Sequence, residues 1–231
     1  MAKKVAIILT AADALPLKDG STHSTGFWAE EFIVAHRGLL AAGFDVSVAT
    51  PDGRPAPVDP GSVSVEAVGE DAARDYRQYL ASISSQLQHP LSLSAIDATD
   101  YSAIVMPGGH GPMVDLAFDE TMGHVLEHAD AEGIVIAPFC HGPAGLLSAK
   151  KADGSFLFAG RTMTAFTDRE ETMGGVQGIT WYLASKLNER GAHVTAGEPF
   201  TSHIEIDGNL ISGQNPQSSA AVTNAVIAAL R

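Results

Sequence analysis

The only cysteine of the chain, Cys140, lies where a thiol could act as a nucleophile. It follows the apolar run "GIVIAPF" and precedes "HGPAGLL", in which residues 142, 144 and 145 are small. When a strand turns sharply into a helix, the side chain at the turn is exposed and the helix N-terminus favours a thiolate. The alternative is an inert cysteine that packs as a small apolar residue. Packing needs neither a turn nor an adjacent imidazole, so the pattern favours a nucleophile.

Two groups that could assist a thiol stand close to it in the sequence. His141 is a candidate base or proton carrier, although an imidazole at a helix start can also simply face solvent. The turn in "MPGGHGPMVDL" ends the preceding apolar run. Gly108 and Gly109 permit a ligand to approach the backbone, so their N–H groups and that of His141 are candidate donors to an oxyanion. His110 is a possible wall of the same pocket.

The segment "TGFWAEEFIVAHRGLLAAG" predicts a helix, residues 25–43, that carries two adjacent acids. Glu31 falls on one stripe with Phe27, Val34 and Gly38, which is the stripe expected to face a sheet. A carboxyl on a packed face is costly unless it is hydrogen-bonded or kept neutral. We therefore expect Glu31 to serve the site and Glu30 to be a solvated surface acid.

A further acidic pair follows the run "RTMTAF", within "TDREETMGGV". Either Glu170 or Glu171 could accept a hydrogen bond from His141 and orient it, which would complete a Cys-His-carboxylate arrangement. The alternative is that both acids stabilise the N-terminus of a helix through its dipole. Spacing alone leaves the two interpretations open.

The sequence also contains "HVLEH", residues 124–128, which matches the H-x-x-E-H pattern of inverted zinc peptidases. Such a short pattern arises by chance, and the acidic stretch around it is typical of a solvated helix face. We expect no metal ion and no cofactor.

Composition narrows the class of protein. The chain has 231 residues, of which 45% are apolar, and it carries 27 acidic against 14 basic residues, a net charge of -13. One large α/β domain over residues 1–231 is expected. The acidic balance argues against nucleic acid and anionic membranes as partners. The run "KKVAIILTAADAL" is interrupted by Asp13 and is read as a strand rather than a signal peptide or membrane span. A single cysteine cannot form an internal disulfide, which fits a reducing, cytoplasmic location.

Short apolar runs alternate with helical patterns along the chain. The runs "VAIILT", "DVSVAT", "SAIVMP" and "GIVIAPF" predict a doubly wound, mainly parallel sheet with helices on both faces. Further strands are expected at "RTMTAF" and "HVTAG", and Gly-Asn between "HIEID" and "LISG" predicts a hairpin. A helix over "NPQSSAAVTNAVIAAL" closes the chain. Ligand sites of such sheets gather at the carboxyl ends of the strands, where Cys140 is placed.

Five motifs carry a family resemblance when they are taken in order and spacing. They are "TGFWAEE", "PGGHGPMVDL", "CHGPAGLL", "TAFTDREE" and "DGNLISGQNPQSS". Together they resemble the ThiJ/PfpI superfamily, the class I glutamine amidotransferase-like fold, over nearly the whole chain. "CHGP" and "GQNP" resemble most the branch of stress-related proteins described as glyoxalase III and as heat-shock chaperones.

This resemblance implies a flavodoxin-like sheet, a homodimer and roles for four residues. Cys140 would be the nucleophile with His141 beside it, Glu31 the acid that holds the thiol, and Glu171 the outer carboxylate, although a slip of one position would select Glu170. The chain departs from the family pattern in two places. It has Ala35 where a proline is often found, and "QGITWYLASKL" where a proline and an acidic pair are common.

We expect a cofactor-independent cysteine enzyme that acts on small reactive aldehydes, most concretely methylglyoxal plus water giving lactate. The chemistry would pass through a hemithioacetal on Cys140 and an enediolate. One alternative is a holdase-type chaperone that binds unfolded clients through an apolar patch. Another is an amidase, peptidase or deglycase that uses the same residues.

Overall fold

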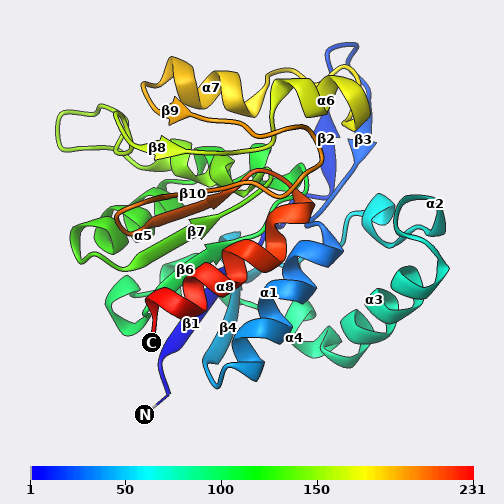
Figure 1. Ribbon diagram of the computed structural model, residues 1–231, viewed down its shortest axis with the longest axis horizontal. Coiled ribbons are helices and arrows are strands. Elements are labelled where there is room, and N and C mark those ends of the chain that lie inside the picture. The colour runs from blue at the N-terminus through cyan, green and yellow to red at the C-terminus, as the bar shows by residue number, and fades with distance from the viewer. Residues whose placement is uncertain (1) are drawn as a thin grey trace.

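A seven-stranded sheet forms the centre of the computed structural model, which describes residues 2–231 (Figure 1). Met1 of the predicted 1–231 domain lies outside the described residues. The strands follow the order β10-β11-β7-β6-β1-β4-β5, and all neighbours are parallel except the antiparallel pair β10 and β11. The bounds are β1 (Lys4–Ile8), β4 (Asp45–Thr50), β5 (Leu91–Ser92), β6 (Ala103–Met106), β7 (Val135–Pro138), β10 (Ile204–Asp207) and β11 (Leu210–Gly213).

The predicted apolar runs form the central strands. Every residue of β6, β7 and β11 is buried, and β1 is buried after Lys4. Helices cover both faces of such strands, so continuous apolar sequence replaces the alternation of a half-exposed strand. The hairpin β10–β11 was predicted from Gly-Asn and is confirmed. Gly208 in its turn has a φ of +58°, which glycine adopts without strain.

Helices α1 (Ala29–Ala41) and α8 (Ser219–Ala229) pack side by side over one face of the sheet (Figure 1). Phe32, Leu39 and Val226 belong to the core beneath them. The other face is covered by α5 (Glu120–Ala131), α7 (Leu183–Glu189) and the 3-10 helix η7 (Gly142–Ser148). The chain therefore has the predicted α/β fold with helices around a mainly parallel sheet.

The remaining helices and strands lie around this core. They are α2 (Val65–Val68), α3 (Glu70–Ser82), α4 (Ser84–Gln88), α6 (Asp168–Gly174), the antiparallel pair β2 (Ala14–Pro16) and β3 (Thr22–Ser24), and the parallel pair β8 (Thr162–Met163) and β9 (His193–Val194). The β2–β3 hairpin was not predicted. No helix within residues 2–231 is long and apolar enough to cross a membrane.

Two sequence predictions differ from the structure. The run "RTMTAF" contributes only β8, outside the central sheet, because Thr164 N–H donates to the Ser212 hydroxyl and Phe166 N–H to the carbonyl of Cys140 instead of forming a ladder. The segment after Cys140 is not an α-helix but η7, a 3-10 helix of seven residues. The α-helix N-terminus that was expected to favour a thiolate is therefore replaced by the start of a 3-10 helix.

Candidate active site

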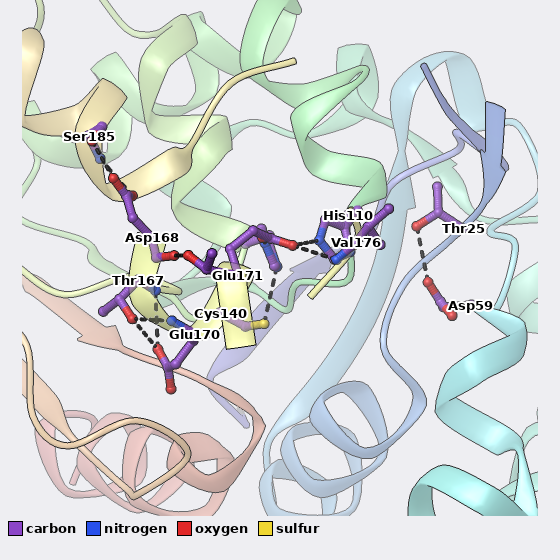
Figure 2. A network of polar contacts seen from close by, with 12 residues as sticks. Thr25, Asp59, His110, Cys140, Thr167, Asp168, Glu170, Glu171, Val176 and Ser185 are labelled. Carbon is purple, nitrogen blue, oxygen red and sulfur yellow. Dashed lines mark hydrogen bonds and ion pairs between the residues drawn. The ribbon is translucent and has the colours of Figure 1, made fainter. Parts of the chain in front are cut away.

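Cys140 comes two residues after the end of β7, beyond Phe139, at the carboxyl ends of the central strands (Figure 2). Its φ is +57°, a left-handed conformation that is uncommon for a residue with a Cβ. Two hydrogen bonds hold it: Cys140 N–H donates to the carbonyl of Gly213 at 2.9 Å, and Phe166 N–H donates to the Cys140 carbonyl at 2.9 Å. This strained turn is the geometry of a nucleophile elbow.

Two glycines allow the neighbouring turns to approach the elbow. A Cβ on Gly142 would lie 1.9 Å from the carbonyl oxygen of Met106, so only glycine fits there. Gly109 has a φ of +84°, and a Cβ on it would lie 2.2 Å from the carbonyl oxygen of Gly26. The loops after β6 and β7 and the start of α1 therefore meet around the sulfur.

His141 connects the thiol to Glu171. Its Nδ1 lies 3.4 Å from Cys140 Sγ, and its Nε2 lies 2.8 Å from Glu171 Oε2. Burial, with help from nearby His110, lowers the pKa of His141 to about 4, and the partly opposing contribution comes from Glu171. A neutral imidazole that donates from Nε2 carries its lone pair on Nδ1. That lone pair faces the thiol and can accept its proton.

Glu171 accepts hydrogen bonds on both carboxyl oxygens. Oε2 accepts from His141, while Oε1 accepts from His110 Nε2 at 2.9 Å and from Val176 N–H at 2.7 Å. Burial alone would raise the pKa of Glu171, but the hydrogen bonds from His110 and His141 outweigh it and lower that pKa well below its ordinary value. The carboxyl group is therefore ionised and acts only as an acceptor.

Glu170, the other candidate at this position, is hydrogen-bonded to Thr167 instead (Figure 2). It forms a capping box with Thr167 at the start of α6, and its Oε1 accepts from Phe200 N–H and from Asn215 Nδ2 at 2.8 Å each. The T-x-x-E pattern of residues 167–170 is the sequence signature of such a box. That signature would have assigned the cap to Glu170 and left Glu171 for His141.

Glu31 is fully buried beside the thiol, as predicted, although Val34 and Gly38 of the predicted stripe are only half-buried and the buried face of α1 includes Ile33. Its Oε2 accepts from Gly108 N–H at 2.5 Å, and its Oε1 has no hydrogen-bond partner among the described residues. Burial raises the pKa of Glu31 to about 8. The carboxyl group therefore holds a proton at neutral pH and can donate it. Glu30 is half-buried rather than fully solvated, and burial raises its pKa too.

The protonation state of Cys140 differs from the sequence prediction, which expected a thiolate. Cys140 is 4% exposed, and burial, followed by the charge of Glu31, raises the pKa of Cys140 well above its ordinary value. The N–H groups of Gly109 and His141 oppose this rise by hydrogen bonding to the sulfur, but they do not reverse it. The resting group is a thiol, and its proton must move to His141 as a substrate reacts.

Of the three backbone N–H groups that were predicted to bind an oxyanion, one has another partner. Gly108 N–H is engaged by Glu31, so it is not free for an oxyanion. The N–H groups of Gly109 and His141 favour the ionised form of the sulfur, so they are still candidate donors to an oxyanion formed beside it. Gly108 is therefore a partner of Glu31, and the other two residues retain the proposed donor role.

A cavity of about 250 Å³ opens onto Cys140. A neighbouring cavity of about 420 Å³ shares Trp28, His110, Gly174 and Gly175 with it. A third cavity, of about 320 Å³ beside Phe118 and Trp181, does not touch Cys140. The residues that line the first cavity are Trp28, Ala67, Gly109, His110, Cys140, His141, Phe166, Gly174, Gly175, Phe200, Pro216 and Gln217.

Metal-binding geometry does not occur at "HVLEH". His124 is exposed and lies 3.1 Å from Glu127, which also accepts from Lys150 N–H. Among residues 2–231, the side chains whose donor atoms converge are His110, His141 and Glu171, within 4.8 Å of one another. Hydrogen bonds between these three groups account for their convergence.

Dialysis of the protein against a strong chelator should leave any turnover that depends on Cys140 unchanged, and that turnover should not depend on glutathione. The reason is that the thiol, the imidazole and the carboxyl groups supply nucleophile, base and acid without a metal ion. The measurement is the initial rate before and after dialysis. A loss that added zinc restores would contradict this mechanism.

The fold agrees with the comparisons to known proteins. The chain belongs to the DJ-1/PfpI family, whose model matches residues 23–229. It is 29% identical to a Bos taurus glutamine amidotransferase-like class 1 domain-containing protein 1, over 80% of this chain and 81% of that protein. It is 28% identical to protein/nucleic acid deglycase HchA of Pseudomonas aeruginosa, over 94% of this chain and 77% of the relative. The crystal structure of a Candida albicans glyoxalase III superposes with a TM-score of 0.84 at 25% identity, covering 98% of this chain and 97% of the other.

Proposed function

We propose that this protein is a cofactor-independent enzyme of the glyoxalase III type that converts methylglyoxal, or a related 2-oxoaldehyde, and water to lactate. The observation that carries the proposal is the relay from Cys140 through neutral His141 to ionised Glu171, beside the protonated Glu31. The similarity to a glyoxalase III structure and to HchA supports it. The small cavity at the thiol suits a small aldehyde.

The first step forms a covalent adduct. His141 Nδ1 takes the thiol proton as Sγ attacks the aldehyde carbon C1, and the imidazolium that results pairs with Glu171. The C1 oxygen develops negative charge beside the N–H groups of Gly109 and His141 and then takes the proton back from His141. The product of this step is a neutral hemithioacetal.

The later steps turn this adduct into an acid. A proton leaves C1 and enters C2 through an enediolate, which converts the hemithioacetal into a thioester. Glu31, which holds its proton at neutral pH, can donate a hydrogen bond to the sulfur or to a substrate oxygen as charge develops there. Water then hydrolyses the thioester to lactate and regenerates the Cys140 thiol.

A deglycase is the second candidate function, because HchA is named for that activity and because the cavity at Cys140 adjoins a larger one. An adduct of a 2-oxoaldehyde on an amine would place its carbonyl carbon at Cys140 and its larger part in the neighbouring cavity. The absence of nucleic acid as a partner, expected from the charge, stays a prediction. Comparing kcat/KM on free methylglyoxal and on a methylglyoxal-treated peptide decides between the two candidates.

The pH profile of kcat/KM should show a plateau bounded by two groups of the free enzyme. Below about pH 4 His141 becomes protonated and cannot accept the thiol proton, so the rate should fall. Above about pH 8 Glu31 loses the proton that it donates, so the rate should fall again. Initial rates from pH 3.5 to 10 in buffers of constant ionic strength test this. A rate that keeps rising above about pH 9 would show that a free thiolate, without the Glu31 proton, is the reactive form.

A further inference from the structure

One carboxylate, Glu171, orients two imidazole rings in this site. His141 and His110 both approach it through Nε2, at 2.8 and 2.9 Å, and their ring centroids are 4.0 Å apart. Both histidines and Glu171 are at most 9% exposed. The site therefore contains two histidines held in the same way, of which the adduct-forming step uses only one.

The hydrogen bonds determine which nitrogen of each ring is available. An ionised carboxylate only accepts, so each imidazole must carry a proton on Nε2, and each neutral ring then has its lone pair on Nδ1. Nδ1 of His141 faces the sulfur. Nδ1 of His110 has no hydrogen-bond partner among the described residues. It is also not one of the fully buried polar atoms. It therefore reaches open space.

That open space is the substrate cavity. His110 lines both the cavity at Cys140 and the neighbouring cavity, whereas His141 lines only the first, is 2% exposed and packs against Phe166 with ring centroids 4.6 Å apart. Both ring nitrogens of His141 are thus engaged, Nδ1 at the sulfur and Nε2 at Glu171. The lone pair of His110 is open to the space that the rest of the substrate must occupy.

The proposed reaction needs a base at that place. Transfer of a proton from C1 to C2 requires a group that first accepts and then donates. Glu31 already holds its proton at neutral pH and therefore cannot accept one. His141 can accept the thiol proton at the sulfur, but it has little exposure to the cavity.

We propose that His110 is the catalytic base of the proton transfer, through its Nδ1. This inference rests on the proposed function. Nδ1 removes the C1 proton, and the C1–H electron pair forms the C1=C2 bond while the C2 carbonyl pair moves to oxygen. The hydroxyl proton passes from the C1 oxygen to the C2 oxygen, and Nδ1 returns its proton to C2. C1 is oxidised and C2 reduced by the same two electrons, so no external oxidant is needed, and the imidazolium is paired with Glu171 meanwhile.

The test compares two steps in the variant His110→Gln. A glutamine amide can still donate to Glu171, but it cannot carry a proton. We expect kcat/KM on methylglyoxal to fall roughly 10²-fold. The rate at which iodoacetamide alkylates Cys140, which reports the thiol and His141 alone, should stay within about twofold of wild type. The exposed His124, as His124→Gln, is the matched control and should change neither rate.

A kinetic isotope effect adds a second measurement, which should not change if His110 has only a structural role. With methylglyoxal deuterated at C1, the kinetic isotope effect on kcat should be larger in His110→Gln than in wild type, because breaking the C1–H bond becomes slower than the other steps. Thermal melts of both proteins check the fold.

Each other outcome overturns the inference in a recognisable way. Parallel losses of turnover and alkylation would mean that His110 only positions Glu171. Unchanged turnover would mean that His110 is only a wall of the cavity. If wild type itself does not turn over methylglyoxal, the proposed function fails and this inference fails with it.

Discussion

Replacing Cys140 with alanine should reduce kcat/KM on methylglyoxal by at least ~10⁴-fold, since no other group can form the hemithioacetal. Cys140 is the only cysteine, so no second thiol can replace it. The side chain is small and buried, and its loss should leave the fold intact, which a thermal melt verifies.

The same variant also separates an enzyme from a holdase. Suppression of the aggregation of an unfolded client by a surface patch would not need the thiol. Large exposed apolar side chains are found on separate elements, such as Phe118, Met173 and Ile206. A variant that keeps its turnover would place the chemistry elsewhere. A protein with no turnover but with aggregation suppression that survives Cys140→Ala would favour the chaperone.

Replacing Glu31 with glutamine should lower kcat/KM by ~10²-fold or more, whereas Glu30→Gln should be nearly silent. Glutamine keeps the size and can still accept from Gly108 N–H, but it has no acidic proton to give. The adjacent Glu30 diverges by about 100° on α1, and it is Glu31 that accepts from Gly108 N–H and acts on the pKa of Cys140. Equal losses, or a larger loss at Glu30, would contradict the role of Glu31.

Glu31→Gln should also change how stability depends on pH. The folded pKa of Glu31 is about 8, against an ordinary 4.5, so the folded state keeps a proton that the unfolded chain releases. The contribution of Glu31 to stability is fully present below about pH 4.5 and is lost as pH rises to about 8. The loss is at most ~5 kcal/mol, at ~1.4 kcal/mol per pH unit.

The variant lacks this loss, so it should be more stable than wild type at pH 8.5 and similar to it at pH 4.5. Urea unfolding at both pH values measures the difference. A variant less stable than wild type at pH 8.5 would mean that neighbouring groups stabilise Glu31 as an ionised carboxylate in the folded state. Glu30→Gln is the matched control for this measurement as well.

Local patterns were sufficient to predict the central fold and part of the site. Apolar runs without alternation predicted the parallel strands, and Gly-Asn predicted the hairpin at 208–209. The apolar stripe of α1 selected Glu31 over Glu30, because adjacent side chains on a helix diverge. The cysteine between an apolar run and a stretch of small residues predicted a sharp turn, and Cys140 has a φ of +57° in that turn.

Features that depend on contacts between distant segments could not be predicted in this way. The pKa of Cys140 is set by burial and by Glu31, which is remote in sequence, so the predicted thiolate was wrong for the resting state. His110 was assigned to the pocket wall, since nothing in "PGGHG" shows that Glu171 will bind its Nε2. The departure of residues 164–166 from a strand depends on Ser212, which arrives from β11.

The most direct test of the central claim is the product that wild-type protein forms from methylglyoxal alone. Purified protein without glutathione or added metal should convert ¹³C-labelled methylglyoxal to lactate, followed by NMR, faster than it hydrolyses amides or peptides in a parallel panel. Disappearance of methylglyoxal without lactate, or turnover of amides with none of the dicarbonyl, would contradict the account.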